Sequence, residues 1–401
     1  MKILIYDSHN FTLGGAQKYI LFLAEILKYY GEVTIAYTGD YNFEFLEKDF
    51  DTRLKDIKFK KVGDYELKHY SSLFSVLLRD FLRKRIAKKV SRLSSKSDLF
   101  FFSSHFTSYV QPKPRAKKNI SLCHFPNKLE RLAMYNTKIN KNSFFGRIYL
   151  GFYEFFSRLF FSPVKNSYIQ DYQYLVCNSK YTQKYIIKYW KKNTELLYPP
   201  IQMNKNFFKS KKNIIVSFGR FDKRKKTLEL VNAYKNLSKS LKNWKYYIFI
   251  PKFEAKYQKE DFEKFKKELE KFDNIIFFEG LGSQEIQKYL SISKIFWNLS
   301  GLGEDENKNP QNIEHFGMVN TEAMSFGCIP IIFNGGGHKE IIQNGKNGFL
   351  VNNPNELIEK TLNLISNENL RKKMAENAFE KAKDFSFEKF REKFIRILNL
   401  K

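Results

Sequence analysis

The sequence is poor in cysteine, in proline and in long hydrophobic runs. It holds 3 cysteines and 10 prolines in 401 residues. Cys123, Cys177 and Cys328 are far apart and lack metal-ligand spacing, which argues against a disulfide framework and a cysteine metal site. Each lies in or beside an apolar run, so we expect buried free thiols in a reducing compartment. No run of about 18 apolar residues is present, and we expect no membrane-spanning helix.

Acidic residues are scarce relative to basic ones. The chain has 42 Asp and Glu against 70 Lys and Arg, a formal net charge of +28. Such an excess favours a polyanionic partner: nucleic acid, an anionic membrane or a phosphorylated substrate. No RNA- or DNA-binding motif is recognised, and the aromatic residues fall in apolar patterns rather than among arginines. We therefore expect no nucleic-acid partner and keep a basic nucleic-acid-binding protein as an alternative.

Short apolar runs alternate with helical patterns in two series. The first opens at residues 2–6 and the second at residues 213–218, and this alternation predicts two doubly wound parallel α/β domains. The break at Tyr198-Pro199-Pro200 and the charged segment after it separate the series. We place the domains at residues 1–205 and 206–385, with a final helix over residues 386–401. Met1-Lys2 runs directly into a strand pattern, so we expect no signal peptide.

Two features of the first series point to a ligand crevice. Gly14-Gly15 stands between the first strand and a helix, the arrangement that approaches phosphates in doubly wound folds. No GxGxxG is present, and a plain tight turn is the alternative. His124 leaves the end of the strand at residues 119–123, so it points toward the crevice outside the carboxyl ends of the strands. A structural histidine is the alternative there.

The second series repeats the strand, turn and helix of the first, and its turn carries cations. Gly219-Arg220 follows its first strand, and Lys225 stands near the start of the next helix. An arginine that can bind in a bidentate manner and a lysine that acts as a point charge suit a diphosphate. A basic surface turn is the alternative, because lysine is frequent throughout the chain.

Two carboxylates, Glu314 and Glu322, flank a predicted helix start. A helix that begins near Gly317 would present the bare N–H groups of Gly317, Met318 and Val319, which bind anions. One carboxylate would then meet a sugar and the other a ribose, with a phosphate between them. Further on, Gly335-Gly336-Gly337 follows a strand and would let backbone amides come close to a ligand.

Two helical segments suggest a membrane surface. Residues 73–93 form a basic amphipathic pattern that suits anionic lipid, with an ordinary core-facing helix as the alternative. Residues 144–164 are apolar but carry a charged stripe, which suits a membrane interface or a lipid tail; a buried helix is the alternative. Asp49-Phe50-Asp51 follows a charged helical pattern rather than a strand, and we interpret it as solvated surface.

The form Glu-x-Phe-Gly-x4-Glu over residues 314–322 resembles the signature of the family 4 retaining glycosyltransferases, which have the GT-B fold. Its Glu-His-Phe-Gly-Met start is similar to the branch of the lipid-linked oligosaccharide mannosyltransferases. The resemblance extends over nearly the whole chain, with its motifs in the family's order. It implies two doubly wound Rossmann-like domains that face across a cleft, with the final helix crossing back onto the first.

The resemblance also implies an activity. It is retaining transfer of a hexose, with mannose as one candidate, from a GDP- or UDP-hexose to a glycan or polyprenyl-linked acceptor. It implies a cytoplasmic enzyme at the inner membrane face, with no metal and no cofactor. The implied catalytic residues are His124, Glu314, Arg220 and Lys225. The implied donor-binding residues are Gly14, Gly15, Arg220, Lys225, Glu314, Phe316, Gly317, Met318, Val319 and Glu322.

Within this resemblance, the cations would bind the diphosphate, Glu314 the sugar and Glu322 the ribose. His124 would contact the transferred sugar from the opposite domain. Lys226 stands where the family often has glycine, so either Lys225 or Lys226 would reach the phosphate. An inactive GT-B partner subunit is a further alternative, against which the intact acidic and cationic pairs argue.

Overall fold

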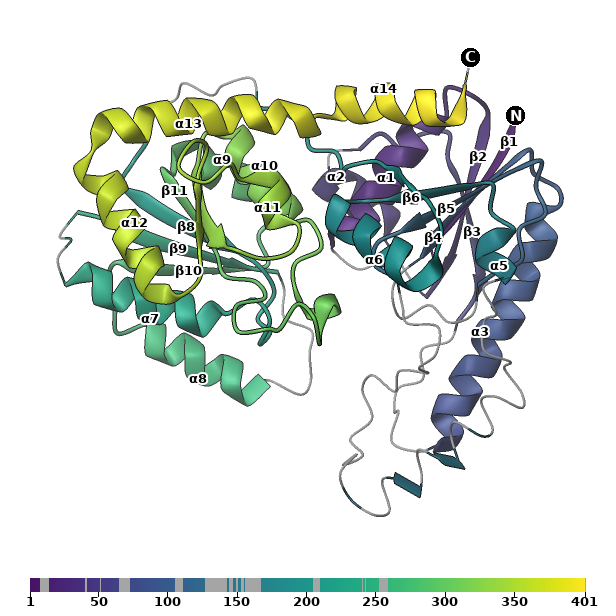
Figure 1. The fold of residues 1–401 in the computed structure, drawn as a ribbon, viewed down its shortest axis with the longest axis horizontal. Helices are drawn as coiled ribbons and strands as arrows, with labels where there is room; N and C mark the ends of the chain where they lie inside the picture. The colour runs from purple at the N-terminus through teal and green to yellow at the C-terminus, as the bar shows by residue number, and fades with distance from the viewer. Residues whose placement is uncertain are drawn as a thin grey trace. The chain divides into compact units, whose positions relative to one another are not determined.

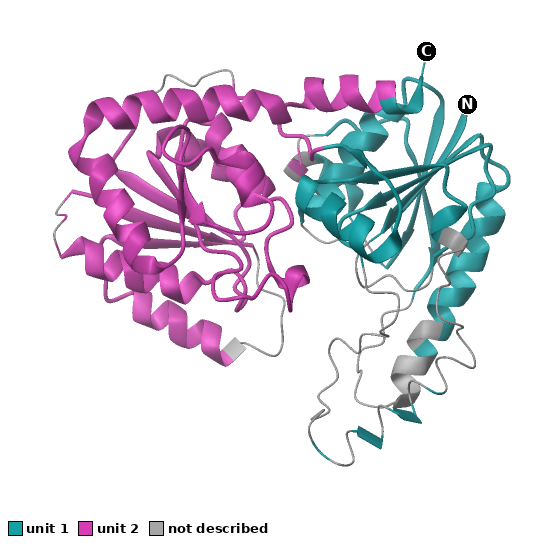
Figure 2. Ribbon diagram, viewed as in Figure 1, with its two compact units in different colours: residues 1–48, 52–197, 397–401 teal, residues 49–51, 198–396 magenta. Residues whose placement is uncertain are grey.

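The computed structural model places two parallel α/β units along the chain (Figure 1). The description covers residues 1–7, 14–39, 42–50, 52–64, 73–104, 111–126, 143, 147–148, 151–152, 155, 167–204, 210–239, 241, 243–251 and 259–400. Unit 1 consists of residues 1–48, 52–197 and 397–401, and unit 2 of residues 49–51 and 198–396 (Figure 2). The predicted domain boundary at residue 205 lies outside the described residues.

Unit 1 contains a seven-stranded sheet in the order β3-β2-β1-β4-β5-β6-β7, and every recorded strand pair is parallel. All six residues of β4 are buried, as expected of a strand covered on both faces. The strand order reverses between β1 and β4, which is where doubly wound sheets bind ligands. The strands are β1 (Lys2–Asp7), β2 (Glu32–Thr38), β3 (Lys58–Gly63), β4 (Leu99–Ser104), β5 (Lys118–Cys123), β6 (Tyr174–Cys177) and β7 (Glu195–Leu196).

The helices of unit 1 follow the predicted pattern where they are described. They are α1 (Gly15–Leu27), α2 (Phe43–Phe50), α3 (Leu73–Ser94), α5 (Ser167–Gln170) and α6 (Lys180–Trp190). The hydroxyl of Ser179 accepts the N–H of Thr182 at 2.9 Å and caps α6, as its place before the helix predicts. The predicted apolar helix at residues 144–164 falls almost entirely outside the described residues, as does Asp51 of the Asp49-Phe50-Asp51 segment.

Unit 2 contains a six-stranded sheet in the order β10-β9-β8-β11-β12-β13, again with parallel pairs. The order reverses between β8 and β11, the kind of place where doubly wound sheets bind ligands. Its strands are β8 (Ile214–Phe218), β9 (Lys245–Ile250), β10 (Ile275–Glu279), β11 (Ile295–Asn298), β12 (Ile329–Phe333) and β13 (Phe349–Val351). Its helices are α7 (Thr227–Ser238), α8 (Lys259–Leu269), α9 (Ser283–Ile292), α10 (Met318–Ser325), α11 (His338–Ile341), α12 (Pro354–Ser366), α13 (Glu368–Ala382) and α14 (Phe387–Leu398).

The helix α14 carries one apolar stripe. Phe390, Phe394 and Leu398 are spaced four residues apart and all are buried. Residues 397–401 belong to unit 1, where Lys118 Nζ donates to the carbonyl of Leu398 at 3.2 Å. The role of this helix as a connection back to the first domain stays a prediction.

The three cysteines are free and buried, which confirms the expectation from their spacing and surroundings. Cys123 and Cys177 lie opposite each other on the neighbouring strands β5 and β6. Within the described parts of the chain, no helix has both the length and the apolar character needed to cross a bilayer.

The core of unit 2 includes a buried indole whose polar atom depends on one partner. Trp297 on β11 is 1% exposed, and its Nε1 donates to the hydroxyl of Thr361 on α12 at 3.1 Å. Replacing this threonine by valine keeps the shape but leaves a buried N–H without an acceptor.

We predict that Thr361→Val lowers the free energy of unfolding by about 1 to 3 kcal/mol. Urea denaturation followed by tryptophan fluorescence measures it. The matched control is Ser366→Ala on the same helix, where an exposed hydroxyl bonds only to carbonyls of its own helix. Equal midpoints for both variants would show that the Trp297 contact contributes nothing.

Candidate active site

The N-terminus of α10 begins at a glycine that no other residue type could easily replace. Gly317 precedes the helix with φ 100°, in the left-handed region. A Cβ there would lie 2.4 Å from Nδ2 of Asn320. The helix therefore starts within one residue of the predicted position. The first N–H groups of an α-helix have no partner within the helix, so this end suits an anion.

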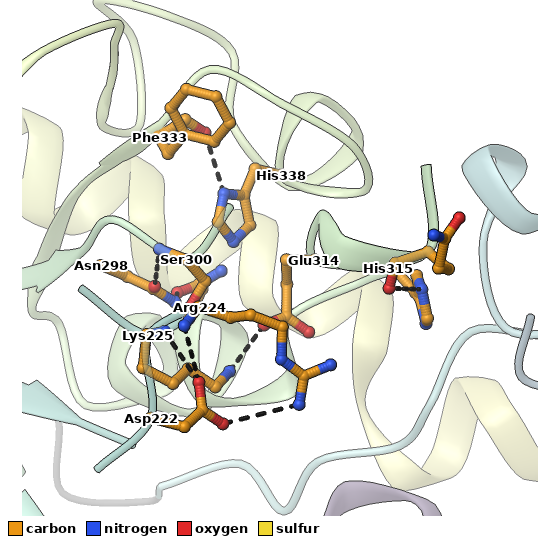
Figure 3. Close-up of polar contacts among 11 residues, drawn as sticks. Asp222, Arg224, Lys225, Asn298, Ser300, Glu314, His315, Phe333 and His338 are labelled. Carbon is orange, nitrogen blue, oxygen red and sulfur yellow. Dashed lines mark hydrogen bonds and ion pairs between the residues drawn. The ribbon is translucent and has the colours of Figure 1, made fainter. Parts of the chain in front are cut away.

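Glu314, in the loop before α10, meets Lys225 from the loop after β8 (Figure 3). Lys225 Nζ lies 2.8 Å from Oε2 of Glu314, and the two side chains are 24% and 21% exposed. The carboxylate of Asp222 accepts the backbone N–H groups of Arg224 at 2.8 Å and of Lys225 at 3.1 Å, and so holds the loop. The structure thus joins two residues that the sequence placed in separate motifs.

The surroundings of Glu314 favour its charged form. Burial by itself raises the pKa of this carboxyl, but the ammonium of Lys225, together with His338 and His315, lowers the pKa to about 2. Burial also lowers the pKa of His315 to about 4, against the opposing effect of Glu314. At neutral pH the loop before α10 therefore carries a carboxylate beside an ammonium and an uncharged imidazole.

Lys225 and Lys226 pair with different carboxylates, and Lys226 has a left-handed backbone. Lys226 takes φ 57° and ψ 37° at the start of α7 and pairs with Glu229 at 3.5 Å. Glycine adopts this left-handed conformation without strain, which accounts for the glycine that is common at this place in the resembling family. Only Lys225 of the two reaches Glu314.

Phe316 lies in the core of unit 2. Its side chain is 3% exposed, stacks on Tyr198 with centroids 5.4 Å apart and meets Phe385 edge-on. The expectation that Phe316 binds the donor stays a prediction. The ring anchors the turn that carries Glu314 and Gly317, because an aromatic ring buried on two sides fixes the backbone on which it stands.

The triglycine segment also supports this turn. Gly337 donates its N–H to the carbonyl of Glu314 at 2.9 Å. A Cβ on Gly336 would lie 2.3 Å from that carbonyl, and one on Gly337 would lie 2.3 Å from the carbonyl of His315. Close contact of chain against chain accounts for Gly336 and Gly337, and the approach of this segment to a ligand stays a prediction.

Arg220 and Glu322 are not members of the ion pair between Lys225 and Glu314. Arg220 follows β8 and is exposed, and no ion pair recorded among the described residues includes it. Glu322 lies within α10 and is half-buried. Met318 and Val319 are half-buried and pack against the apolar cluster beneath α10.

In unit 1 the predicted histidine lies in a polar cluster at the carboxyl edge of the sheet. His124 follows β5, is 8% exposed, and has Nε2 3.1 Å from the hydroxyl of Ser103 at the end of β4. Tyr19 meets its ring edge-on, with centroids 5.9 Å apart. Sequence reasoning missed Ser103, although a serine at the end of an apolar strand was a visible signal.

Gly14 and Gly15 lie at the start of α1, the helix that follows β1 of the same sheet. Gly14 is extended, with φ −161° and ψ 162°, and precedes the helix without a side-chain cap. Nearby, Gln17 Nε2 donates to the buried carboxylate of Asp7 at 3.3 Å. Asp7 ends β1 opposite Ser103 of β4, so it stands at the reversal of strand order. Neither Asp7 nor Gln17 was predicted from the sequence as a site residue. Residues 8–13, which complete the predicted glycine turn, lie outside the described residues.

Comparison with known proteins gives a family match for the second half of the chain. Residues 200–381 match the family described as Glycosyl transferases group 1. An uncharacterized glycosyltransferase of Methanocaldococcus jannaschii is 49% identical over 82 residues, which are 20% of this chain and 23% of that protein. The poly(glycerol-phosphate) alpha-glucosyltransferase of Bacillus subtilis is 30% identical over 149 residues, 35% of this chain and 20% of that protein. The chain aligns with 20 to 44% of the length of the curated relatives it matches.

Solved structures match over the whole chain. HepE of Anabaena in complex with UDP and glucose superposes with a TM-score of 0.67 at 15% identity, covering 100% of both chains. The two parallel sheets and this likeness show the GT-B fold, as the sequence predicted. Residues 200–381 are therefore similar to the glycosyl transferases group 1 family, and the chain has the GT-B fold.

The lowered pKa of Glu314 predicts a pH effect on stability. A carboxyl whose pKa is lower in the folded than in the unfolded protein stabilises the fold above its unfolded pKa of about 4.3, and this stabilisation is lost as pH falls toward 2. Between pH 5 and pH 3 the difference in unfolding free energy between the wild type and Glu314→Gln should narrow by about 1 to 2 kcal/mol.

Urea denaturation at a series of pH values measures this difference. Glu359→Gln serves as the control, because Glu359 is exposed on α12 and pairs only with the neighbouring Lys360. A gap between the wild type and Glu314→Gln that stays constant from pH 5 to pH 3 would contradict the assignment of a lowered pKa to Glu314.

Proposed function

We propose that this protein is a retaining glycosyltransferase that moves a hexose from a nucleotide-sugar donor to a glycan or lipid-linked acceptor. The observation that carries the proposal is the ion pair between Lys225 and Glu314 beside the N-terminus of α10. The group 1 family match over residues 200–381 supports it. A carboxylate that accepts from sugar hydroxyls and a cation suited to a diphosphate are here held within one hydrogen bond of each other.

In this proposal the departing diphosphate is stabilised by fixed positive charge. Lys225 carries three N–H donors, so it can keep Glu314 and still donate to a phosphate oxygen. Arg220, exposed after β8, and the N–H groups at the start of α10 would provide further donors. Groups already oriented before the reaction stabilise developing charge without reorganisation. The proposal therefore assigns the neutralisation of the diphosphate to these residues and not to a metal ion.

The carboxylates would position the donor. Glu314, ionised and turned toward Lys225, would accept hydrogen bonds from the hydroxyls of the sugar, and Glu322 those from the ribose. His124 would orient the sugar from the first domain. Its Nε2 already pairs with a hydroxyl, that of Ser103, which shows that the ring can bind one.

Two indications of the donor's base and sugar point to different nucleotide sugars. The Anabaena structures are described as complexes with UDP and with UDP-glucose. The Glu-His-Phe-Gly-Met motif instead favours GDP-mannose through its resemblance. A screen of UDP- and GDP-hexoses for released nucleotide decides between them, and failure of every donor to be consumed would overturn the proposed function.

Unit 1, which would bind the acceptor, would also bind an anionic membrane surface. In the last part of α3, Ile86 and Val90 are buried in a core cluster, while Phe81 is 49% exposed. Its exposed face carries Arg85, Lys88, Lys89 and Arg92. This part of the helix is thus core-facing with a basic outer side, which would attract lipid by charge. Phe152 and Phe155, 56% and 62% exposed, add apolar surface in the same unit.

We predict that Lys225→Ala lowers kcat/KM for the donor by about 10²-fold or more, because it removes a preorganised cation. Lys226→Ala is the matched control and should change kcat/KM by less than about 3-fold, since that side chain pairs with Glu229. Initial rates of nucleotide release measure both. Equal losses in the two variants, or a larger loss in Lys226→Ala, would contradict the assignment.

We predict that the protein sediments with vesicles containing phosphatidylserine at low salt and that the triple variant Arg85→Glu, Lys88→Glu and Arg92→Glu does not. Each basic residue near an anionic surface contributes about 1 kcal/mol. The control is the reversal of three exposed lysines on unit 2, Lys308, Lys372 and Lys389. Recovery of all wild-type protein in the supernatant would exclude the membrane.

A further inference from the structure

Unsatisfied buried polar atoms gather at one place in unit 2. Among the described residues, five buried side-chain atoms have no hydrogen-bond partner: Thr52 Oγ1, Gln111 Oε1, Ser300 Oγ, Asn320 Nδ2 and His338 Nε2. The last three lie around the start of α10. Native proteins leave few such atoms, so a group of them calls for a molecule that is not part of the chain.

Asn298 connects two of these residues. Its Nδ2 donates to Oδ1 of Asn320 at 2.8 Å. Its Oδ1 accepts the N–H of Ser300 at 2.9 Å (Figure 3). With its carbonyl oxygen engaged in this way, Asn320 turns its amide nitrogen toward Gly317, where Nδ2 lies 2.4 Å from the position a Cβ would take. The free atom of Asn320 is thus a hydrogen-bond donor whose orientation Asn298 fixes.

His338 offers the opposite group. Its Nδ1 lies 2.8 Å from the carbonyl of Phe333 (Figure 3), and because a carbonyl only accepts, Nδ1 carries the proton. Burial lowers the pKa of His338, so the ring is uncharged at neutral pH. Its Nε2 therefore presents a lone pair, 3.3 Å from the same Cβ position on Gly317.

A donor and an acceptor thus face one point beside Gly317. A phosphate or carboxylate oxygen would satisfy Asn320 but not His338, and an ammonium would satisfy His338 but not Asn320. An oxygen that both donates and accepts satisfies the two together. Gly317 is necessary for this, because a Cβ there would lie 2.4 Å from Nδ2 of Asn320 and 3.3 Å from Nε2 of His338 and would crowd both atoms.

We propose that Asn320 and His338 together bind one hydroxyl-type oxygen. It is either a hydroxyl of the donor sugar or an ordered water that supports the turn carrying Glu314 and Gly317. The inference builds on the proposed function. The position is continuous with that turn, because Gly337, next to His338, donates its N–H to the carbonyl of Glu314. Asn320 and His338 are thereby specificity-determining residues if the oxygen belongs to the sugar, and positioning residues if it is water.

Monodeoxy analogues of UDP-glucose and GDP-mannose distinguish the two sources. For a sugar hydroxyl, one monodeoxy donor loses about 10- to 100-fold in kcat/KM with the wild type, because buried polar groups are left unpaired. In Asn320→Asp, which removes the donor and keeps the shape, and in His338→Phe, that loss should shrink to below about 3-fold. His338→Gln, which can still accept, should restore the loss.

If the oxygen belongs to a water, the loss in kcat/KM with each monodeoxy donor is the same in the variants as in the wild type. A crystal structure of the wild type with UDP then shows an oxygen bonded to Asn320 Nδ2 and His338 Nε2. Thr361→Val is the control for lost stability, since it breaks a buried hydrogen bond elsewhere in unit 2 and should change no deoxy penalty.

The proposal is overturned if no deoxy penalty depends on Asn320 or His338 and no oxygen lies between the two atoms in the crystal. It is also overturned if ¹⁵N NMR shows His338 protonated at Nε2 at neutral pH. Failure of the wild type to consume either donor would count against the proposed function instead, and the crystal structure would still test the oxygen site.

Discussion

The ion pair between Lys225 and Glu314 is the contact on which the rest of the site depends. It joins two loops 89 residues apart in sequence, one after β8 and one before α10. Both side chains are largely shielded from water, and attraction between charges grows as the surrounding dielectric falls. The pair therefore fixes a carboxylate and a cation beside the positive end of a helix. Such an arrangement can receive both the sugar and the phosphates of one donor.

Backbone geometry holds this pair in place as much as side chains do. Asp222 caps the Lys225 loop, and Gly337 binds the carbonyl of Glu314. Gly336 allows two chain segments to touch, while Gly317 keeps a Cβ from crowding Asn320 and His338. The glycines of this region thus serve contacts within the protein first. Any ligand would meet the surface that those contacts shape.

Charge is divided between a few shielded groups and a broad basic surface. The formal charge of +28 lies mostly on exposed lysines and arginines, such as those on the outer side of α3. Such charges act weakly one by one and attract polyanions together. The shielded pair in unit 2 acts at a single point. These two scales of electrostatics match a protein that binds a phosphorylated donor in one place and meets an anionic surface in another.

The sequence by itself determined the two parallel sheets and the start of α10, because strand and helix periods and helix-stopping residues act over short distances. It also identified Glu314 and Lys225 as members of separate motifs. Only the tertiary structure decided that these two meet, that Phe316 is buried between Tyr198 and Phe385, and that Lys226 pairs with Glu229. Asn320 and His338 went unnoticed in the sequence. Their significance comes from hydrogen bonds that distant segments make or leave unmade, and local pattern does not encode which distant segments touch.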